Sequence, residues 1–272
     1  MLRRYRRSSI VHAALATVLA LVLVTVPAQA GSIFLTGHDP DFHSQAGNTA
    51  GAQRINQVAI GFIQDPGYNP FYNTAPKFLF VESNIAVPGG HLRGKNGIVA
   101  SGYVEGVDFE HHTYLTLMQE LNLLGTKYSA IVIASDFGGT LTQDELDVLN
   151  GRRADIVAFL NAGGGIYMMA ESNGGAGLTP NGPHFYVIPF VVTSTQFDQT
   201  ESGIQVTPYG QSLGLTNADV NGNVSHCIFT SAGPLNVVDL DPAGNMLSLA
   251  GRPETISVKE LTWGKLRKIF GE

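Results

Sequence analysis

Short apolar runs alternate with amphipathic segments through the first two thirds of the chain. Four runs are apolar almost throughout, at residues 32–37, 77–82, 130–134 and 166–170. Continuous apolar runs of this length predict strands that are buried on both faces of a sheet. Between these runs, apolar residues recur at helical intervals over residues 52–63, 113–124 and 142–161, which predicts three helices.

The order of strands and helices predicts a doubly wound α/β fold with a mostly parallel sheet. Thr142 with Glu145 three residues later forms a capping box, and Gly125 follows the second helix. Residues 38–51 and 88–97 are expected to be loops. Beyond Pro183, additional C-terminal strands that extend or flank the sheet are expected at residues 185–192, 203–207, 225–230, 236–239 and 246–250.

The first 30 residues have the features of a secretory signal peptide. Four arginines precede an apolar run from about residue 11 to residue 26, and Ala-Gln-Ala at residues 28–30 is a small-x-small cleavage site. The alternative is an uncleaved membrane anchor, although the run is short for a membrane span. Cleavage predicts a secreted or periplasmic protein with no stable membrane span, because no other stretch is apolar enough.

Composition narrows the classes of protein to which the chain can belong. Hydrophobic residues make up 44% and charged residues 14% of the chain, which excludes a disordered polyampholyte. The formal net charge is −6, and loss of the four N-terminal arginines leaves 12 basic and 22 acidic residues. An acidic chain without a basic patch argues against nucleic acid as a partner. The single cysteine, Cys227, cannot form an internal disulfide and is expected to be buried in a strand.

Residues 128–175 carry the most informative motif. An apolar strand precedes a Leu-Thr-x-x-Glu helix start, the helix ends in Phe-Leu-x-x-Gly-Gly-Gly, and the next strand enters a Gly-rich turn. This stretch resembles the class I glutamine-amidotransferase-like superfamily, and most closely its ThuA-like branch, associated with trehalose utilisation. The resemblance implies a flavodoxin-like sheet for a domain over residues 31–252. It implies no single reaction, because the superfamily contains amidotransferases, peptidases, chaperone-like hydrolases and members without known activity.

In catalytic members of the superfamily a nucleophile, usually Cys and sometimes Ser, follows the strand expected here at residues 166–170. The turn at residues 170–174 reads Ala-Glu-Ser-Asn-Gly, a relaxed nucleophile elbow. Ser172 would be the nucleophile and His226 the base, with Glu171, Asp239 or Asp241 as the acid. No glutaminase activity is expected, because the cysteine is missing. The alternative is that this segment forms an ordinary turn.

The loop after the first strand holds two histidines and two aspartates within six residues. Imidazole and carboxylate groups are competent ligands for zinc or a similar divalent ion. The candidate metal ligands are therefore His38, Asp39, Asp41 and His43. The alternative is a polar loop in which the aspartates serve only as turn and cap residues.

A second group, His111 and His112 after Asp108 and Glu110, precedes the helix expected at residues 113–124. Carboxylates in the first turn of that helix would favour its N-terminus. Neither group of histidines has the spacing of a recognised metal motif.

The positions of the strand ends connect the candidate residues. In a parallel sheet the carboxyl ends of the strands share one edge, where ligands bind. The predicted strands end near His38, Asp136 and Ser172. We therefore expect the first loop, Ser172 and His226 to line one pocket.

Two classes of function follow. The first is an exported hydrolase of a small ester, amide or saccharide-derived substrate that uses Ser172 and His226, with a divalent metal such as zinc at the first loop. The second is a non-catalytic protein that binds a small molecule or carbohydrate in the same cleft. Residues 253–272 form a basic tail with the only tryptophan, either a sorting or docking peptide or a terminal helix packed on the acidic domain.

Overall fold

The computed structural model describes residues 30–83, 94–136, 141–169 and 185–254. The predicted signal segment up to residue 29, the turn that contains Glu171 and Ser172, and the tail from residue 255 lie outside the described residues. Among the helices within the described ranges, none has the length and apolar character needed to cross a membrane.

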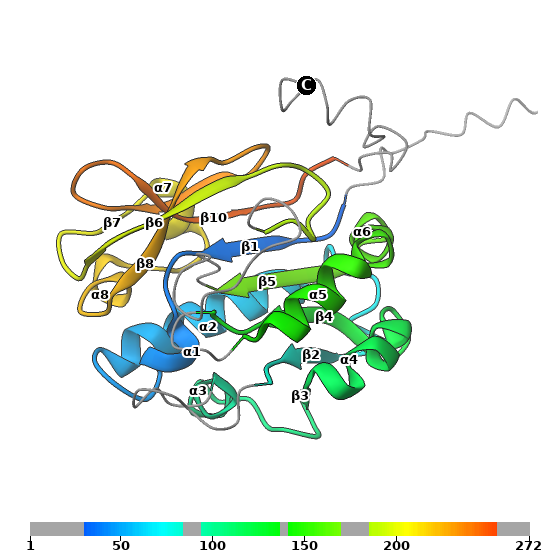
Figure 1. The fold of residues 1–272 in the computed structure, drawn as a ribbon. Helices are drawn as coiled ribbons and strands as arrows, with labels where there is room; N and C mark the ends of the chain where they lie inside the picture. The colour runs from blue at the N-terminus through cyan, green and yellow to red at the C-terminus, as the bar shows by residue number, and fades with distance from the viewer. Residues whose placement is uncertain (1–29, 84–93, 137–140, 170–184, 255–272) are drawn as a thin grey trace, which may run out of the picture.

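Within these ranges a ten-stranded mixed sheet forms the centre of the molecule (Figure 1). Its parallel strands are β1 (Ile33–Thr36), β2 (Lys77–Val81), β3 (Phe109–His112), β4 (Tyr128–Ile133) and β5 (Gly165–Met169). They lie in the order β3-β2-β4-β5-β1. The prediction that the four apolar runs are parallel neighbours in one sheet is therefore confirmed.

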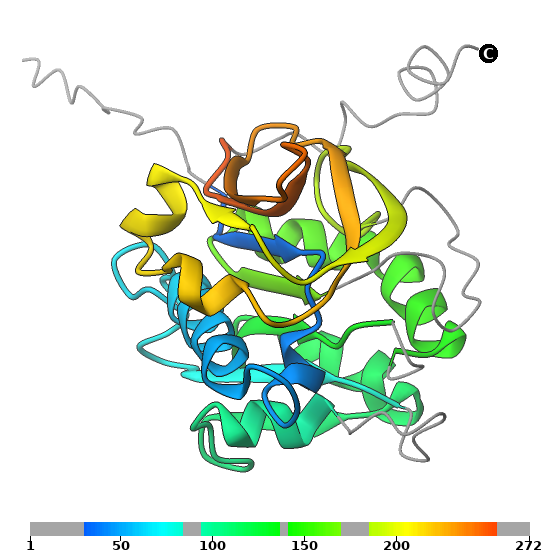
Figure 2. The same cartoon turned by 90° about the vertical axis from the view of Figure 1, so that its left-hand side faces the viewer.

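An antiparallel extension continues the sheet beyond β1 (Figures 1 and 2). Its strands are β6 (Thr193–Thr200), β7 (Gln205–Val206), β8 (Ser225–Ser231), β9 (Asn236–Leu240) and β10 (Met246–Gly251). β10 pairs with β1, with β8 and with β9, while β6 pairs with β8 and β7 with β9. The C-terminal strands thus extend the sheet, and β10 joins them to its parallel part.

Helices cover both faces of the parallel strands. On one face, α2 (Thr49–Ile63) and α3 (Gly94–Ala100) share an apolar core with strand residues such as Phe34. On the other face, α4 (Tyr114–Glu120), α5 (Gln143–Gly151) and α6 (Arg153–Asn161) share a core with residues such as Leu35. Neighbouring strand residues point to opposite faces, and burying each such side chain contributes about 1.5–3 kcal/mol.

The remaining helices within the described ranges are short. They are α1 (Pro40–His43), the 3₁₀ helix η2 (Leu121–Leu123), α7 (Pro208–Ser212) and α8 (Asn217–Val220). α1 begins directly after the loop that follows β1, with proline at its first turn, a position where the missing N–H is no loss. The loop expected at residues 38–51 therefore contains a helical turn and the start of α2.

The parallel strands are ordered differently from those of flavodoxin, whose order is 2-1-3-4-5. β1 lies beside β5 and is separated from β2 by both β4 and β5. The chain therefore has an α/β fold with a large, mostly parallel central sheet and helices on both faces, in an order of its own.

The strand expected at residues 185–192 is wrong. Residues 185–190 form turns, and pairing begins only at β6. Phe185 has a φ of +56°, a left-handed conformation that is incompatible with a strand, and Pro189 has no N–H to donate to a ladder. The apolar residues of this segment, including Val187 and Ile188, are buried in the core instead. The pattern predicted burial correctly and secondary structure incorrectly.

Three smaller predictions also need correction. The polar sequence Phe-Glu-His-His forms β3, so Glu110 lies on a strand and not in the first turn of a helix. α3 begins at Gly94, inside the connector expected at residues 88–97. The single helix expected at residues 142–161 is divided at Arg152 into α5 and α6, next to the weak helix former Gly151. The capping box of Thr142 and Glu145 is present as predicted.

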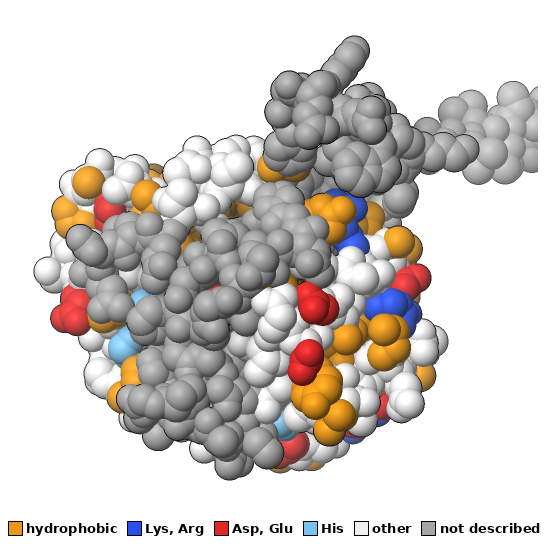
Figure 3. Space-filling view, viewed as in Figure 1, with side chains coloured by type: hydrophobic (Ala, Val, Ile, Leu, Met, Phe, Trp, Pro, Cys, Tyr) orange, Lys and Arg blue, Asp and Glu red, His pale blue; other side chains and the backbone are white. Residues whose placement is uncertain are grey.

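One exposed apolar surface lies on α4. Its side chains Tyr114, Leu115 and Met118 are 40%, 72% and 47% exposed. Hydrophobic side chains gather on the corresponding part of the molecule in the space-filling view (Figure 3).

Candidate functional site

Buried acidic residues follow the parallel strands at their carboxyl edge. β1, β2 and β4 are followed by Asp39, Glu82 and Asp136, which are 0%, 1% and 0% exposed. A buried carboxylate is costly unless it is paired, hydrogen-bonded or coordinated. Three such groups from three strands are therefore more than turn formation requires, and they mark this edge as the candidate site.

β8 brings His226 to the same edge. The backbone N–H of His226 donates to the carbonyl of Gly37 at 2.7 Å, and Ser225 forms a bridge with His38. This close crossing requires glycine at position 37, because a Cβ there would lie 2.0 Å from the carbonyl oxygen of Cys227. The backbone contact places the His226 imidazole next to the residues that follow β1.

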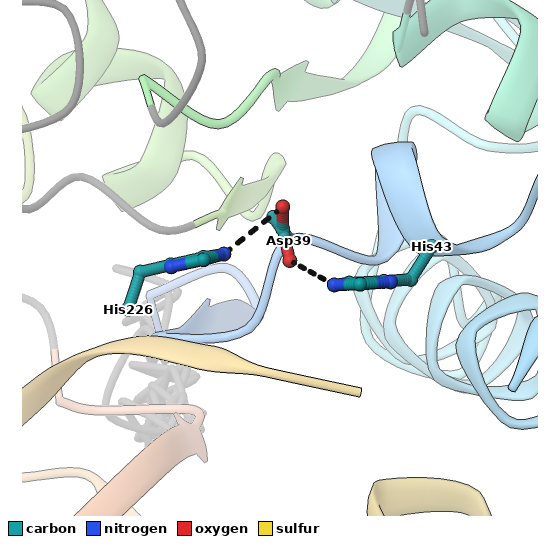
Figure 4. Close-up of side chains that lie close together, drawn as sticks. All are labelled: Asp39, His43 and His226. Carbon is teal, nitrogen blue, oxygen red and sulfur yellow. Dashed lines mark ion pairs between the residues drawn. The ribbon is translucent and has the colours of Figure 1, made fainter. Parts of the chain in front are cut away.

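Asp39, His43 and His226 form what we call the edge centre (Figure 4). Asp39 lies between the two rings: its Oδ1 is 3.3 Å from Nε2 of His43, and its Oδ2 is 3.1 Å from Nε2 of His226. The side chains are 0%, 13% and 3% exposed. One ligand atom from each residue lies within 4.8 Å of the others, so the three could hold a metal ion.

The hydrogen bonds around the edge centre define its protonation. Nδ1 of His43 lies 3.1 Å from the carbonyl of Ala46. A carbonyl only accepts, so Nδ1 carries a hydrogen, and whenever the ring is neutral its Nε2 presents a lone pair toward Asp39. Among the described residues, neither carboxylate oxygen of Asp39 accepts a hydrogen bond from a donor in proper geometry. Within the described residues, the ion pairs of Asp39 are thus with imidazole nitrogens alone.

Burial controls the pKa values at this edge. It raises the pKa of Asp39 well above its ordinary value, against the nearby charge of His43. Burial, reinforced by the neighbouring His38, lowers the pKa of His226 to about 3. His226 is therefore a neutral imidazole at neutral pH, and a neutral imidazole is the form that binds metals.

Asp41 has a structural position in the same loop. Its carboxylate accepts from the backbone N–H of Ser135 at 2.9 Å, from the Ser135 hydroxyl at 2.9 and 3.0 Å, and from the N–H of Phe42 at 3.0 Å. Burial raises the pKa of Asp41, although the hydrogen bonds from Ser135 oppose the shift. These bonds tie α1 to the end of β4 and hold Asp39 and His43 in place.

His38 lies beside the edge centre but points elsewhere. Its Nε2 is 2.8 Å from Oδ2 of Asp239 on β9, and both side chains are almost fully buried. Asp241 is also engaged, since its carboxylate accepts from the N–H groups of Ala243 and Asn245, both at 2.8 Å. The acid that contacts His226 in the structure is therefore Asp39, and not Asp239 or Asp241.

Two further buried acids complete the edge. The carboxylate of Glu82 accepts from the first N–H groups of α3, those of Gly94 at 2.6 Å and Lys95 at 2.9 Å. Glu145, at the start of α5, accepts from the N–H of Thr142 at 3.0 Å. Burial raises the pKa of Glu145 to about 8, and the nearby Glu82 adds to the shift. Glu145 is thus largely protonated at neutral pH.

Glu110, His112 and Glu120 form a second group with possible metal ligands, at β3 and α4. Here Lys77 lies 2.9 Å from Glu110, and Lys127 lies 2.6 Å from Glu110 and 3.1 Å from Glu120. We call these five residues the lysine cluster. Burial opposes ionisation of Glu110, but hydrogen bonds from Lys127 and Lys77 outweigh it and lower its pKa to about 2. The two lysines already neutralise the negative charge that would otherwise attract a metal ion.

The outcome therefore differs between the predicted metal ligands and the predicted nucleophile. Of the four predicted metal ligands, Asp39 and His43 converge, whereas His38 and Asp41 bind other partners. Ser172 and Glu171 lie outside the described residues. β5 ends at Met169, opposite Thr36 of β1, so the segment that contains Ser172 follows a strand that ends beside β1.

Sequence reasoning missed Glu82 and the pairing of Asp39 with His226. Glu82 could have been found, because it is the first acidic residue after an apolar strand, as Asp39 and Asp136 are. The contact between Asp39 and His226 depends on the crossing of β8 over the end of β1. No local pattern signals that crossing.

Comparison of the chain with protein-family models, with curated proteins and with solved structures found no match. The geometry of the carboxyl edge therefore carries the functional argument.

Proposed function

We propose that this chain is an exported hydrolase of a small ester, amide or saccharide-derived substrate, with its active centre at the carboxyl edge of the parallel strands. One observation carries the proposal: buried ionisable side chains from segments far apart in the sequence meet there, among them Asp39, Glu82, Asp136 and His226. Ligands of open α/β sheets bind at this edge, and clustered groups with shifted pKa values are typical of active sites.

The chemistry of the edge supports hydrolysis more than simple binding. Asp39 in contact with the neutral imidazole of His226 supplies a carboxylate and a nitrogen lone pair, the groups that hydrolases use to bind a catalytic metal or to accept a proton. Carboxyl groups with raised pKa values, such as Glu145, can donate a proton to a leaving group near neutral pH. A site that only binds a neutral carbohydrate has no need of these shifts.

The resemblance to the glutamine-amidotransferase-like superfamily supports the same place for the reaction, because Ser172 follows β5 there. The parallel strands and their covering helices support it as far as an α/β sheet. The position of β1 beside β5 does not support a flavodoxin-like strand order.

Hydrolysis by the purified chain tests the proposal. Chromogenic esters, amides and glycosides are the substrates, and Asp39→Asn and His226→Gln are the variants. We expect kcat/KM for the accepted class to fall by about 100-fold or more in both variants. His112→Gln, from the lysine cluster, is the matched control and should keep activity. Unchanged turnover in both edge variants would refute the proposal, and so would binding of a carbohydrate without turnover of any class.

The nucleophile is tested separately. If Ser172 is the nucleophile, a serine-directed fluorophosphonate labels the wild-type chain and does not label Ser172→Ala. If a water molecule is the nucleophile, the probe leaves the active chain unlabelled, and Ser172→Ala keeps its activity. Either result is compatible with hydrolysis at this edge and decides between the two routes.

A further inference from the structure

We infer that Asp39, His43 and His226 bind one zinc ion at the carboxyl edge. The inference rests on the proposed function for the use of the metal in hydrolysis, but it is argued from the three side chains alone and tested without a substrate.

Distance is the first argument. Zinc is bound at about 2.0–2.2 Å by imidazole nitrogen and carboxylate oxygen, so two ligand atoms of a tetrahedral site lie about 3.3 Å apart. Each carboxylate oxygen of Asp39 makes one contact close to this length, Oδ1 with Nε2 of His43 at 3.3 Å and Oδ2 with Nε2 of His226 at 3.1 Å. Small side-chain rotations would direct all three groups at one point, since one ligand atom from each already lies within 4.8 Å of the others.

The hydrogen bond of His43 is the second argument. A histidine that binds a metal through one nitrogen commonly donates its other N–H to a backbone carbonyl or a carboxylate, which fixes the ring. His43 donates Nδ1–H to the carbonyl of Ala46 at 3.1 Å. Its Nε2 lone pair is thereby aimed at Asp39. The loop after α1 therefore already supplies the outer hydrogen bond of a metal-bound histidine.

Charge is the third argument. An imidazole lone pair that faces a carboxylate oxygen is repelled unless a positive centre lies with them. Among the described residues no lysine or arginine forms an ion pair with Asp39, and its fully buried carboxylate accepts no hydrogen bond in proper geometry. A divalent cation balances the charge of Asp39 and accepts the Nε2 lone pair of a neutral His43. A pair that relied on hydrogen bonds alone would place an N–H on the carboxylate.

The number of ligands indicates the role of the ion. Structural zinc sites have four protein ligands, whereas catalytic sites have three and keep a position for water or substrate. Within the described residues, two histidines and one aspartate are in reach of one ion, and this set matches the catalytic class. Zinc in such a site lowers the pKa of its bound water to about 7 and polarises a carbonyl oxygen. After that water releases a proton to solvent, the hydroxide would add to the carbonyl carbon of an ester or amide; the C–O or C–N bond would then break, and the departing alcohol or amine would take up a proton from solvent.

Zinc binding by the purified chain tests the inference. The chain is stripped with a chelator, dialysed against zinc, freed of excess metal and assayed for metal content, and its affinity is measured in competition with a chromogenic chelator. We expect one zinc per chain for the wild type, and a loss of about 100-fold or more in affinity for His43→Ala and for His226→Ala. His112→Ala, which removes the histidine of the lysine cluster, should bind as the wild type does.

A second measurement guards against variants that fail to fold. Asp39→Asn preserves the size of the side chain, and its circular dichroism should match that of the wild type while its zinc affinity falls. Cobalt substitution should give the intense visible absorption of a tetrahedral site in the wild type and not in Asp39→Asn. A wild type that holds no zinc after dialysis overturns the inference. Equal zinc content in the folded Asp39→Asn, His43→Ala and His226→Ala variants does so as well.

The two proposals can fail independently. Normal zinc binding with no turnover of any substrate class removes the proposed hydrolase and leaves the metal site. Turnover that is unaffected by complete removal of the metal leaves the hydrolase and refutes the use of zinc in the reaction.

Discussion

Two places among the described residues bring histidine and carboxylates within reach of a common metal ion, and their surroundings are opposite. In the edge centre, Asp39 is fully buried and its ion pairs within the described residues are with histidines alone. In the lysine cluster, Glu110 and Glu120 are partly exposed and each lies within 3.1 Å of a lysine ammonium.

The difference shows that ligand types and distances do not by themselves indicate a metal site. In the lysine cluster the protein supplies its own cations, and Tyr128 donates its hydroxyl hydrogen to Glu120 at 2.5 Å. The carboxylates there are satisfied without a metal. In the edge centre no lysine or arginine among the described residues pairs with the buried carboxylate of Asp39, so an external cation would balance its charge.

The largest expected difference between the edge centre and the lysine cluster is the stabilisation that zinc produces. Zinc at about 100 times its dissociation constant stabilises a one-site protein by about 2.7 kcal/mol, which for a chain of this size raises Tm by about 5–10 °C. We expect this shift in the wild type and in Glu110→Gln, and none in Asp39→Asn. Thermal unfolding with zinc and with chelator measures it, and an equal shift in Asp39→Asn would contradict the assignment.

The pH dependence of stability should have opposite signs at the edge and in the lysine cluster. Glu145, close to the edge, has a pKa raised from 4.5 to about 8, so the folded state binds more protons than the unfolded state in that window. Its contribution to stability therefore falls as pH rises from about 4.5 to 8, by about 1.4 kcal/mol per pH unit at most. Glu145→Gln keeps an acceptor for the capping box and should remove this loss.

Glu110 is the counterpart in that experiment. Its pKa is lowered from 4.5 to about 2, so its stabilising effect is present above about pH 4.5 and is lost as pH falls toward 2. Because the side chain is partly exposed, the effect of Glu110→Gln should be about 1 kcal/mol or less. Urea unfolding of the metal-free wild type and both variants from pH 3 to 8 measures the two slopes. If the free energy of unfolding changed with pH in the same way in both variants, the expected difference between the edge and the lysine cluster would be contradicted.

Removing one carboxylate charge without metal should change stability in opposite directions. Asp39→Asn replaces a buried carboxyl group with which no lysine or arginine among the described residues pairs. The substitution should raise the free energy of unfolding at pH 7 by about 1 kcal/mol. Glu120→Gln weakens the contacts with Lys127 and Tyr128 and should lower it by about 1 kcal/mol. Chemical denaturation in the presence of chelator tests both signs. A loss of stability in Asp39→Asn would mean that Asp39 is compensated within the fold.

The smallest effect concerns salt. Lys127 is 34% exposed, so its pairs with Glu110 and Glu120 are screened by ions. Lys127→Met should cost about 0.5 kcal/mol at low ionic strength and close to nothing in 1 M sodium chloride. His43→Gln, in the more buried edge centre, serves as the comparison and should show little dependence on salt. The same salt dependence for both variants would show that burial does not distinguish the two places.

The parallel half of the fold could be predicted because its signals are local. The run around Leu79 is apolar throughout, which only a strand covered on both faces requires, and Thr142 with Glu145 marks a helix start within four residues. β3 was not predicted because its residues are polar: Glu110 pairs with Lys77 on the neighbouring strand β2 and with Lys127, which precedes β4. The turn at Phe185 was not predicted, because apolar character indicates burial and does not indicate backbone conformation.

The candidate site could be predicted only in part for a related reason. Asp39 and His43 lie four residues apart, and their chemistry is visible in the loop itself. The choice of His226 over His38 as the third member depends on a crossing of backbones at Gly37. Long-range pairing of this kind is set by the packing of whole strands, which a local pattern does not contain.

The position of β10 determines the order in which this protein can be completed. β10 is the last strand along the described chain, yet it lies between β1 and β8, and the N–H of Gly37 donates to the carbonyl of Leu247 at 2.7 Å. A chain that emerges from its N-terminus, from a ribosome or from an export channel, therefore presents Asp39 and His43 long before β10 can join β8 to β1. The third histidine reaches its place only when nearly all of the domain is available, so the centre is completed at the end of synthesis or export.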